Sequence, residues 1–256
     1  MLRASVTLST SAYDVLWHHH KLGDKPNALH TPSPGATHEE RAVLERQAWD
    51  ELQQNGLIHR GRIDEDLLDV LTLLARPTAE IYGWINRAHE RHYSVLVAAC
   101  GQDAVLAVLV DQILHLHPVR STGLAGAVVA ALPTVPPARG RSLTLPTEHL
   151  TLQRAAPDDW LVEVRPGDDE ATSHARTVLA LPRTNAGQLH VAARDRYGHR
   201  HRAAHPLTVL DTPDGRWMTQ LRPGSDGRPW LVLTPADHRL LAARLNEMRA
   251  ALNERA

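Results

Sequence analysis

Histidines at alternate positions are the residues of this chain with the clearest potential for metal chemistry. They occur twice, as His115 with His117 and as His199 with His201. If each pair lies on a strand, its two imidazoles share one face of the sheet and can coordinate Zn²⁺. The sequence offers no third ligand at a recognisable spacing, so a metal-dependent enzyme remains open only as an alternative. The run 18–20 is a weaker candidate, because consecutive residues of a helix point about 100° apart.

Side chains that could act as nucleophiles do not occur in a catalytic pattern. The sequence holds no Gly-x-Ser-x-Gly motif, which would present a serine on the sharp turn of a hydrolase. Cys100 is the only cysteine and closes the apolar run 95–100, so we expect a buried structural thiol in a strand. The sequence therefore predicts a protein that is not an enzyme and has no catalytic residue, metal or cofactor.

An aromatic and polar strand face suggests recognition of a protein. Strand alternation over Ala79–Arg87 places Tyr82, Trp84 and Asn86 on one face and Ile81 on the other. Tyrosine and tryptophan supply large contact areas while keeping a polar group, as interfaces require. Two alternatives remain open: helices cover this face, or a homodimeric scaffold associates through it. Trp217 and Trp230, on the last two predicted strands, pose the same question.

Composition and charge exclude several classes of partner. The chain has 256 residues, enough for one large core or two small ones. Its 28 Lys and Arg nearly balance its 29 Asp and Glu, and a net charge of -1 gives no footprint for nucleic acid. The first ten residues lack the apolar stretch of a signal peptide, and 18 uninterrupted apolar residues occur nowhere. We therefore expect a cytoplasmic protein without membrane insertion.

Two amphipathic helices are predicted between residues 37 and 77. Thr37 and Glu40 have the spacing of a capping box, and Gly56 follows the helix as a C-terminal cap. Asp64 can cap a second helix, which Pro77 ends. Because this second helix is apolar nearly all round, we expect it to pack centrally.

The order of elements repeats along the chain. A short strand, at 5–10 and again at 142–147, precedes a helix, predicted over 13–22 in the first case and 148–155 in the second. Antiparallel strands follow in both halves, and each half closes with a helix. The closing helices are predicted over 123–132 and from 236 to 253, the latter with Pro235 at its first turn, and 169–181 forms a further helix.

Tight turns connect the predicted strands, so neighbouring strands must be antiparallel. The strands are 79–87, 92–100, 104–110 and 113–119, then 188–196, 203–210, 216–221 and 229–233. This pattern predicts an α+β protein with pseudo-twofold duplicated halves, 1–137 and 138–256, packed as one domain.

An ordered set of residues resembles the EspG family, the ESX (type VII) secretion-associated proteins. The set covers nearly the whole chain, although no single motif in it is diagnostic. Departures are Leu189, where the family often has an aromatic residue, and the His-rich segment 17–20. The set comprises Leu16-Trp17, Leu22-Gly23, Pro26, Leu29, Pro32-Ser33-Pro34-Gly35, Glu40-Arg41, Leu44, Leu52, Gly56-Leu57, Leu74-Ala75-Arg76-Pro77, Gly187-Gln188-Leu189, Arg194-Asp195-Arg196 and Asp211-Thr212-Pro213-Asp214-Gly215-Arg216-Trp217.

The resemblance implies a central antiparallel sheet flanked by two helical subdomains. It also implies a non-enzymatic cytosolic chaperone that binds helical-hairpin secretion substrates of the PE/PPE type and shields their apolar tip before export. A WXG-type protein is a related alternative partner, and we expect a monomer or weak homodimer.

The resemblance also implies where the client docks. In the family the client tip lies between a loop of the first group of strands and the C-terminal helical part, which map here to 86–92 and to the last helix. Together with the aromatic strand residues, this gives the predicted partner-binding set: Tyr82, Trp84, Asn86, Arg87, Trp217, Leu240 and Arg244.

Overall fold

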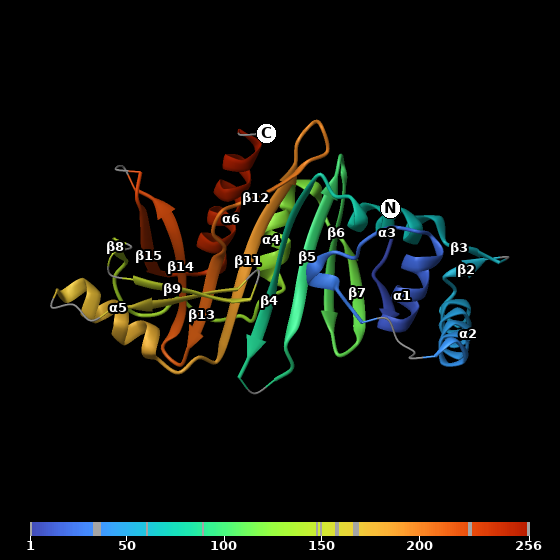
Figure 1. Ribbon diagram of the computed structural model, residues 1–256, viewed down its shortest axis with the longest axis horizontal. Helices are drawn as coiled ribbons and strands as arrows, with labels where there is room; N and C mark the ends of the chain where they lie inside the picture. Colours follow the sequence, from blue (N-terminus) through green and yellow to red (C-terminus); the bar gives the residue numbers. More distant parts are fainter. Residues whose placement is uncertain are drawn as a thin grey trace.

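An eleven-stranded sheet runs through the molecule, and all pairings between its named strands are antiparallel (Figure 1). The computed structural model describes residues 2–254 except 33–36, 60, 89, 147, 149, 157–158, 166–168 and 225–226. Across the sheet the strands are β1 (Val6–Ser9), β7 (Ile113–Pro118), β6 (Asp103–Val110), β5 (Tyr93–Cys100), β4 (Ala79–Arg87), β11 (Asn185–Arg194), β13 (Leu207–Thr212), β14 (Gly215–Pro223), β15 (Pro229–Pro235) and β8 (Leu143–Pro146), while β12 (Arg200–Arg202) pairs with β11 alone.

Helices cover both faces of this sheet, as Figure 1 shows. Around it lie α1 (Thr10–His19), η1 (Asn27–Leu29), α2 (His38–Gln54), α3 (Glu65–Ala75), η2 (Ser121–Gly123), α4 (Leu124–Ala130), α5 (Glu170–Ala180) and α6 (His238–Asn253). Two small hairpins complete the described elements: β2 (Ile58–His59) with β3 (Arg62–Ile63), and β9 (Leu150–Ala156) with β10 (Asp159–Val164). The predicted α+β class, with a central antiparallel sheet between helical groups, is confirmed.

The two faces of the sheet belong to different cores. The face that carries Tyr82, here called the Tyr82 face, packs under α1, η1, α2 and α3 in the first half of the chain and near α5 in the second. The opposite face carries Ile81 and is called the Ile81 face; α4 and α6 cover its middle, with Leu124, Leu241 and Leu245 in the contact. Residue alternation along β4 thus separates the faces as the sequence predicts.

Pairing between β4 and β11 joins the strands of the two halves. The register runs from Ala79 opposite Ala193 to Arg87 opposite Asn185, and we call this pairing the seam. Read outward from the seam, each half shows the same order: four meander strands, the first of which is the seam strand, and then the short strand that opens that half. That the halves arose by duplication stays a prediction.

The predicted start signals of α2 and α3 are confirmed. The Thr37 hydroxyl accepts from the Glu40 N–H at 3.1 Å, and the Thr37 N–H donates to the Glu40 carboxylate at 3.2 Å. Asp64 caps α3 by accepting from the Leu67 N–H at 3.1 Å. Of the proline-glycine motif at 32–35, residues 33–35 lie outside the described residues.

Other predictions are wrong in detail. The segment 148–155, expected to be helical, contains most of β9 (Leu150–Ala156) instead, because β10 supplies its backbone with strand partners. Cys100 is exposed, since it ends β5 directly before the turn to β6. Pro235 ends β15 and Asp237 caps α6 instead. Similarly, Ser9 caps α1 and starts it three residues early.

The strand predicted at 203–210 also differs. Only β13, from Leu207 onward, pairs with β14, while β12 stands apart at Arg200–Arg202. Pro206 intervenes, and proline cannot donate to a strand ladder. The break leaves β12 as a short cationic edge next to β11.

Two glycines set how closely the seam can pack, and they give the first prediction. A Cβ on Gly83 would lie 2.0 Å from the Gln188 carbonyl oxygen, and one on Gly187 would lie 2.4 Å from Cδ1 of Ile85. We expect Gly83→Val to lower the free energy of unfolding by about 1–3 kcal/mol, because the strands must separate to admit the side chain. Urea unfolding followed by circular dichroism measures this change.

Gly126→Ala is the matched control. Gly126 is exposed within α4 and has no atom within 4 Å of a built Cβ, so alanine should be neutral or stabilise by up to about 1 kcal/mol. Equal stability of the Gly83→Val protein and the wild type would show that the seam does not require a residue without a side chain at position 83.

Candidate partner-binding surface

A polar row crosses the Ile81 face at one end of the seam. Strand register places Arg87, Asn185, Asp211 and Arg216 side by side on β4, β11, β13 and β14. Asn185 Nδ2 donates to Asp211 Oδ2 at 3.1 Å, and Arg216 holds both carboxylate oxygens, through Nε at 2.6 Å and Nη2 at 2.8 Å. Asp211 and Arg216 are almost fully buried, so the row is fixed by a paired, hydrogen-bonded charge.

The segment after α4 ties this row to the start of α6. The Pro133 carbonyl accepts from Arg216 Nη2 at 2.8 Å and lies 3.3 Å from His238 Nε2 in the first turn of α6. Just before it, the Ala131 carbonyl accepts from the Tyr93 hydroxyl at 2.8 Å. Burial raises the pKa of Tyr93 to about 12, so this hydroxyl stays a donor at neutral pH. Arg216 of the polar row, Tyr93 of β5 and the first turn of α6 are therefore all tied to one short segment, residues 131–133.

Ion pairs hold the loop that leaves the seam here. Arg87 pairs with Glu90, and Arg91 Nη1 lies 2.8 Å from Asp111 Oδ1 on the neighbouring turn. The Arg87 N–H also donates to His92 Nδ1 at 3.1 Å. Within the described part of this loop, charged side chains therefore form a polar rim beside the row.

The outer side of α6 supplies an apolar group. Asp237 caps the helix by accepting from the Leu240 N–H at 2.7 Å, and this fixes Leu240 in the first turn with its side chain 40% exposed. One turn later Arg244 donates to Gln220 Oε1 at 2.5 Å and pairs with Glu247. Leu240 is thus an exposed apolar side chain next to a fixed charged one, a combination suited to binding another protein.

The other predicted partner-binding residues lie elsewhere. On the Tyr82 face, the Tyr82 ring is 3% exposed and stacks on His190 at 5.2 Å, with the half-buried Trp84 edge-on at 5.9 Å. Asn86 is exposed at the end of the same strand. Trp217 is 2% exposed and packs near His174 of α5, on the same face of the sheet but in the second half of the chain.

The structure therefore divides the predicted set. It places Arg87 at the end of the polar row, and it ties the helix that carries Leu240 and Arg244 to the same row through Pro133, whereas Tyr82 and Trp217 are in the core. A role of any of the seven residues in binding stays a prediction.

The alternate histidines take two different arrangements. His115 and His117 stack at 6.3 Å on β7, and Ser5 Oγ lies 2.7 Å from His117 Nδ1. His199 and His201 instead share the Asp195 carboxylate, with His201 Nε2 2.9 Å from Oδ2. Among the described residues, no three His, Cys, Asp or Glu side chains form a group that could hold a metal ion.

Sequence reasoning missed the polar row, although its signal was present. The turn 212–215 was recognised, but not the consequence that Asp211 and Arg216, which flank it, must lie opposite each other. Pro133 and His238 could not be found from sequence, because a carbonyl and a ring 105 positions apart meet only through tertiary packing.

The fold and this surface define the class of the protein: an α+β chain built on one broad antiparallel sheet, with helices on both faces. None of the described helices has the length and apolar character needed to span a bilayer. The family model of the EspG family matches residues 9–247, so the chain belongs to the EspG family.

A solved structure shares the fold. It is the type VII secretion system chaperone EspG5 of Mycobacterium tuberculosis, in complex with a PE25-PPE41 dimer. The two chains are 17% identical, the alignment covers 94% of each, and the TM-score is 0.64. No curated protein matches the chain.

The turn around Asp195 gives a testable pKa. The bond from His201, together with the N–H groups of His199 and Tyr197, lowers the pKa of Asp195 from 3.8 to about 2. We expect His201→Ala to raise this pKa towards its ordinary value, as measured by carbon-13 NMR titration of the Asp195 carboxyl group. Because the folded-state pKa is lowered, the associated stability is present above the ordinary pKa and is lost as pH falls towards 2.

His115→Ala is the control, since His115 lies on β7 and bonds to Thr7 instead. If Asp195 titrated at the same pH in the His201→Ala protein as in the wild type, the two backbone N–H groups alone would hold the ionised form.

Proposed function

We propose that this chain is a cytoplasmic chaperone of type VII secretion, which binds a helical-hairpin client of the PE/PPE type and shields its apolar tip before export. The observation that carries the proposal is membership of the EspG family over residues 9–247. It is supported by the shared fold with EspG5, whose structure contains a bound PE25-PPE41 dimer. A WXG-type helical hairpin is a related client that the same surface would suit.

The client would dock at the end of the seam, between the loop after Arg87 and the first turns of α6. An apolar tip needs an exposed apolar contact, which Leu240 provides at 40% exposure. It also needs polar groups around that contact to fix its orientation, and Arg87, Glu90 and Arg244 are held by their own ion pairs. Side chains held in this way lose little entropy when a client binds.

The protein in this proposal acts by binding and not by catalysis. It uses no metal or cofactor, binds neither nucleic acid nor a membrane interior, and works as a monomer or weak homodimer. Its halves, 1–137 and 138–256, pack as one domain and act together, since the loop after Arg87 comes from the first and α6 from the second.

Substitution of the exposed leucine tests the docking surface. Leu240→Asp places a charge where the proposed contact is apolar, so we expect capture of a co-expressed PE–PPE-type dimer to fall by about tenfold or more. The measurement is the amount of dimer that co-purifies with the tagged chain, with circular dichroism to check that the fold is kept.

Val43→Asp provides a matched control, because Val43 is 43% exposed on α2, far along the chain from α6. It should leave capture unchanged. Normal capture by the Leu240→Asp protein would rule out this surface. Stoichiometric zinc in protein purified without a His tag, lost together with an activity, would favour an enzyme that uses a histidine pair.

A further inference from the structure

One side of β1 carries backbone groups that no strand of the sheet covers. β1 is a border strand and pairs with β7. The Thr10 N–H donates to the Gln112 carbonyl at 2.8 Å on the β7 side, and along an antiparallel strand the backbone groups alternate between the two sides. The N–H and C=O groups of Ser5, Thr7 and Ser9 therefore point away from β7. We call these outward groups the β1 edge.

Open space lies along the β1 edge. A cavity of about 470 Å³ is lined by Ser5, Val6, Thr7, Ser9, Glu51, Asn55, Leu57 and Ile113. The side chains of Ser5 and Thr7 are exposed, so other molecules have access to this edge. An unpaired edge of this kind is a template to which a strand of another chain can add.

The residues of β1 do not themselves protect its edge. Val6–Ser9 include no proline and no charged side chain, which are common protections of a border strand. At the opposite border of the sheet, β8 ends with Pro146, which has no N–H to donate to a further strand. Any protection of β1 must therefore come from another part of the chain.

A carboxylate from α2 occupies one end of the β1 edge. Glu51 Oε1 accepts from the outward Ser9 N–H at 3.0 Å, and Oε2 accepts from the Ser9 hydroxyl at 2.6 Å. The two residues are 42 positions apart, so tertiary packing brings them together. The Ser9 hydroxyl also accepts from the Ala12 N–H at 3.0 Å, so the cap of α1 does not depend on Glu51.

We propose that Glu51 prevents a second copy of this chain from pairing with the β1 edge. A strand added to this edge must place carbonyl oxygens opposite the outward N–H groups of Thr7 and Ser9. At Ser9 the Glu51 carboxylate already holds that position, so an incoming carbonyl would meet a charged acceptor. A strand laid over this carboxylate would also remove its charge from water, which is unfavourable without a new donor.

A second copy is the chain that this edge would otherwise pair with, because two β1 edges match each other. When two copies of β1 run antiparallel about a twofold axis at Thr7, the Thr7 residues face each other and each Ser5 faces the Ser9 of the other copy. Both outer pairs of this arrangement contain a Ser9. One carboxylate in each chain is therefore enough to disrupt two of the three pairs.

The strand order separates the β1 edge from the proposed client surface. β7, β6 and β5 lie between β1 and β4, which carries Arg87. The inference therefore goes beyond the proposed function and concerns association of the chain with itself.

Sedimentation velocity of the full chain over a range of concentrations tests the proposal. Glu51→Ala removes the carboxylate but leaves the cap of α1 in place, so we expect this variant to dimerise at least tenfold more tightly than the wild type. Glu51→Gln keeps the size of the side chain. It should also associate more readily than the wild type, because a neutral amide can turn its N–H groups towards an incoming carbonyl.

An added proline shows whether the β1 edge is the contact. Thr7→Pro removes the outward Thr7 N–H but no bond to β7, and proline is tolerated at such a position of a border strand. We expect the double variant Glu51→Ala with Thr7→Pro to return to the sedimentation behaviour of the wild type.

Asp50→Ala is the matched control, because Asp50 is the exposed neighbour of Glu51 on α2 and its loss changes the net charge equally. It should sediment like the wild type. All variants should keep the wild-type circular dichroism spectrum and wild-type capture of a PE–PPE-type dimer, so that failure here is distinguishable from failure of the proposed function.

Three outcomes would overturn the proposal. The first is that neither Glu51 variant associates more tightly than the wild type. The second is that association of the Glu51→Ala protein persists when Thr7→Pro is added, which would assign the contact to another surface. The third is that Asp50→Ala has the same effect as Glu51→Ala, which would make net charge the cause instead of the contact with Ser9.

Discussion

The close approach of β4 and β11 is the constraint on which the rest of the structure depends. Gly83 and Gly187 leave no room for a side chain, so the strands of the two halves can continue as one sheet. Because that sheet is continuous, α4 from the first half and α6 from the second cover the same face and share one core. One end of the seam, at Arg87, borders the proposed client surface.

A buried ion pair, Asp211 with Arg216, fixes the position of the linker after α4. Arg216 is fully buried, and Asp211 satisfies two of its donor groups while the Pro133 carbonyl accepts from a third hydrogen. A charge removed from water in this way is tolerable only with such partners, so the pair demands one arrangement of the linker after α4. That linker in turn holds the start of α6. The surface that the sequence predicts for a client is therefore positioned by Asp211 and Arg216, which are buried and cannot contact the client themselves.

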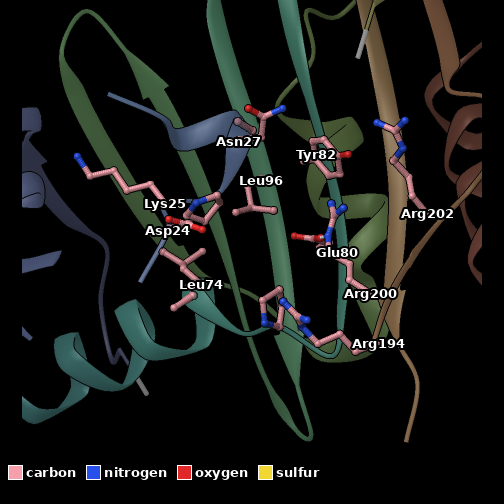
Figure 2. A pocket seen from close by; sticks show the side chains of 14 residues that line it. Asp24, Lys25, Asn27, Leu74, Glu80, Tyr82, Leu96, Arg194, Arg200 and Arg202 are labelled. Atoms are coloured by element: carbon pink, nitrogen blue, oxygen red, sulfur yellow. Dashed lines mark hydrogen bonds and ion pairs between the residues drawn. The ribbon is translucent and has the colours of Figure 1, made fainter. Parts of the chain in front are cut away.

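Local signals explain which parts of the fold could be predicted. The capping box of α2 and the two-residue turns between β5, β6 and β7 depend on neighbouring residues, and the sequence contains all of them. The helix expected at 148–155 was wrong because β10 pairs with that segment, and the site residues Tyr82 and Trp217 proved buried because helices from elsewhere cover them. Aromatic residues satisfy a core and an interface equally well, so sequence alone does not separate the two roles. The arginines at 194–202 are plain in the sequence, whereas the cavity that three of them line forms only where β11 and β12 meet α3 and the chain before η1 (Figure 2).

The strands at the two borders of the sheet have a consequence for solubility. β1 and β8 contain only four residues each, whereas the inner strands contain up to ten. A long border would expose a row of unpaired backbone N–H and C=O groups, to which another chain could add as a further strand. Short border strands expose few such groups, so strands of other chains have little backbone to pair with at either edge of the sheet. For a protein proposed to hold partners with exposed apolar surface, this geometry limits aggregation of the carrier itself.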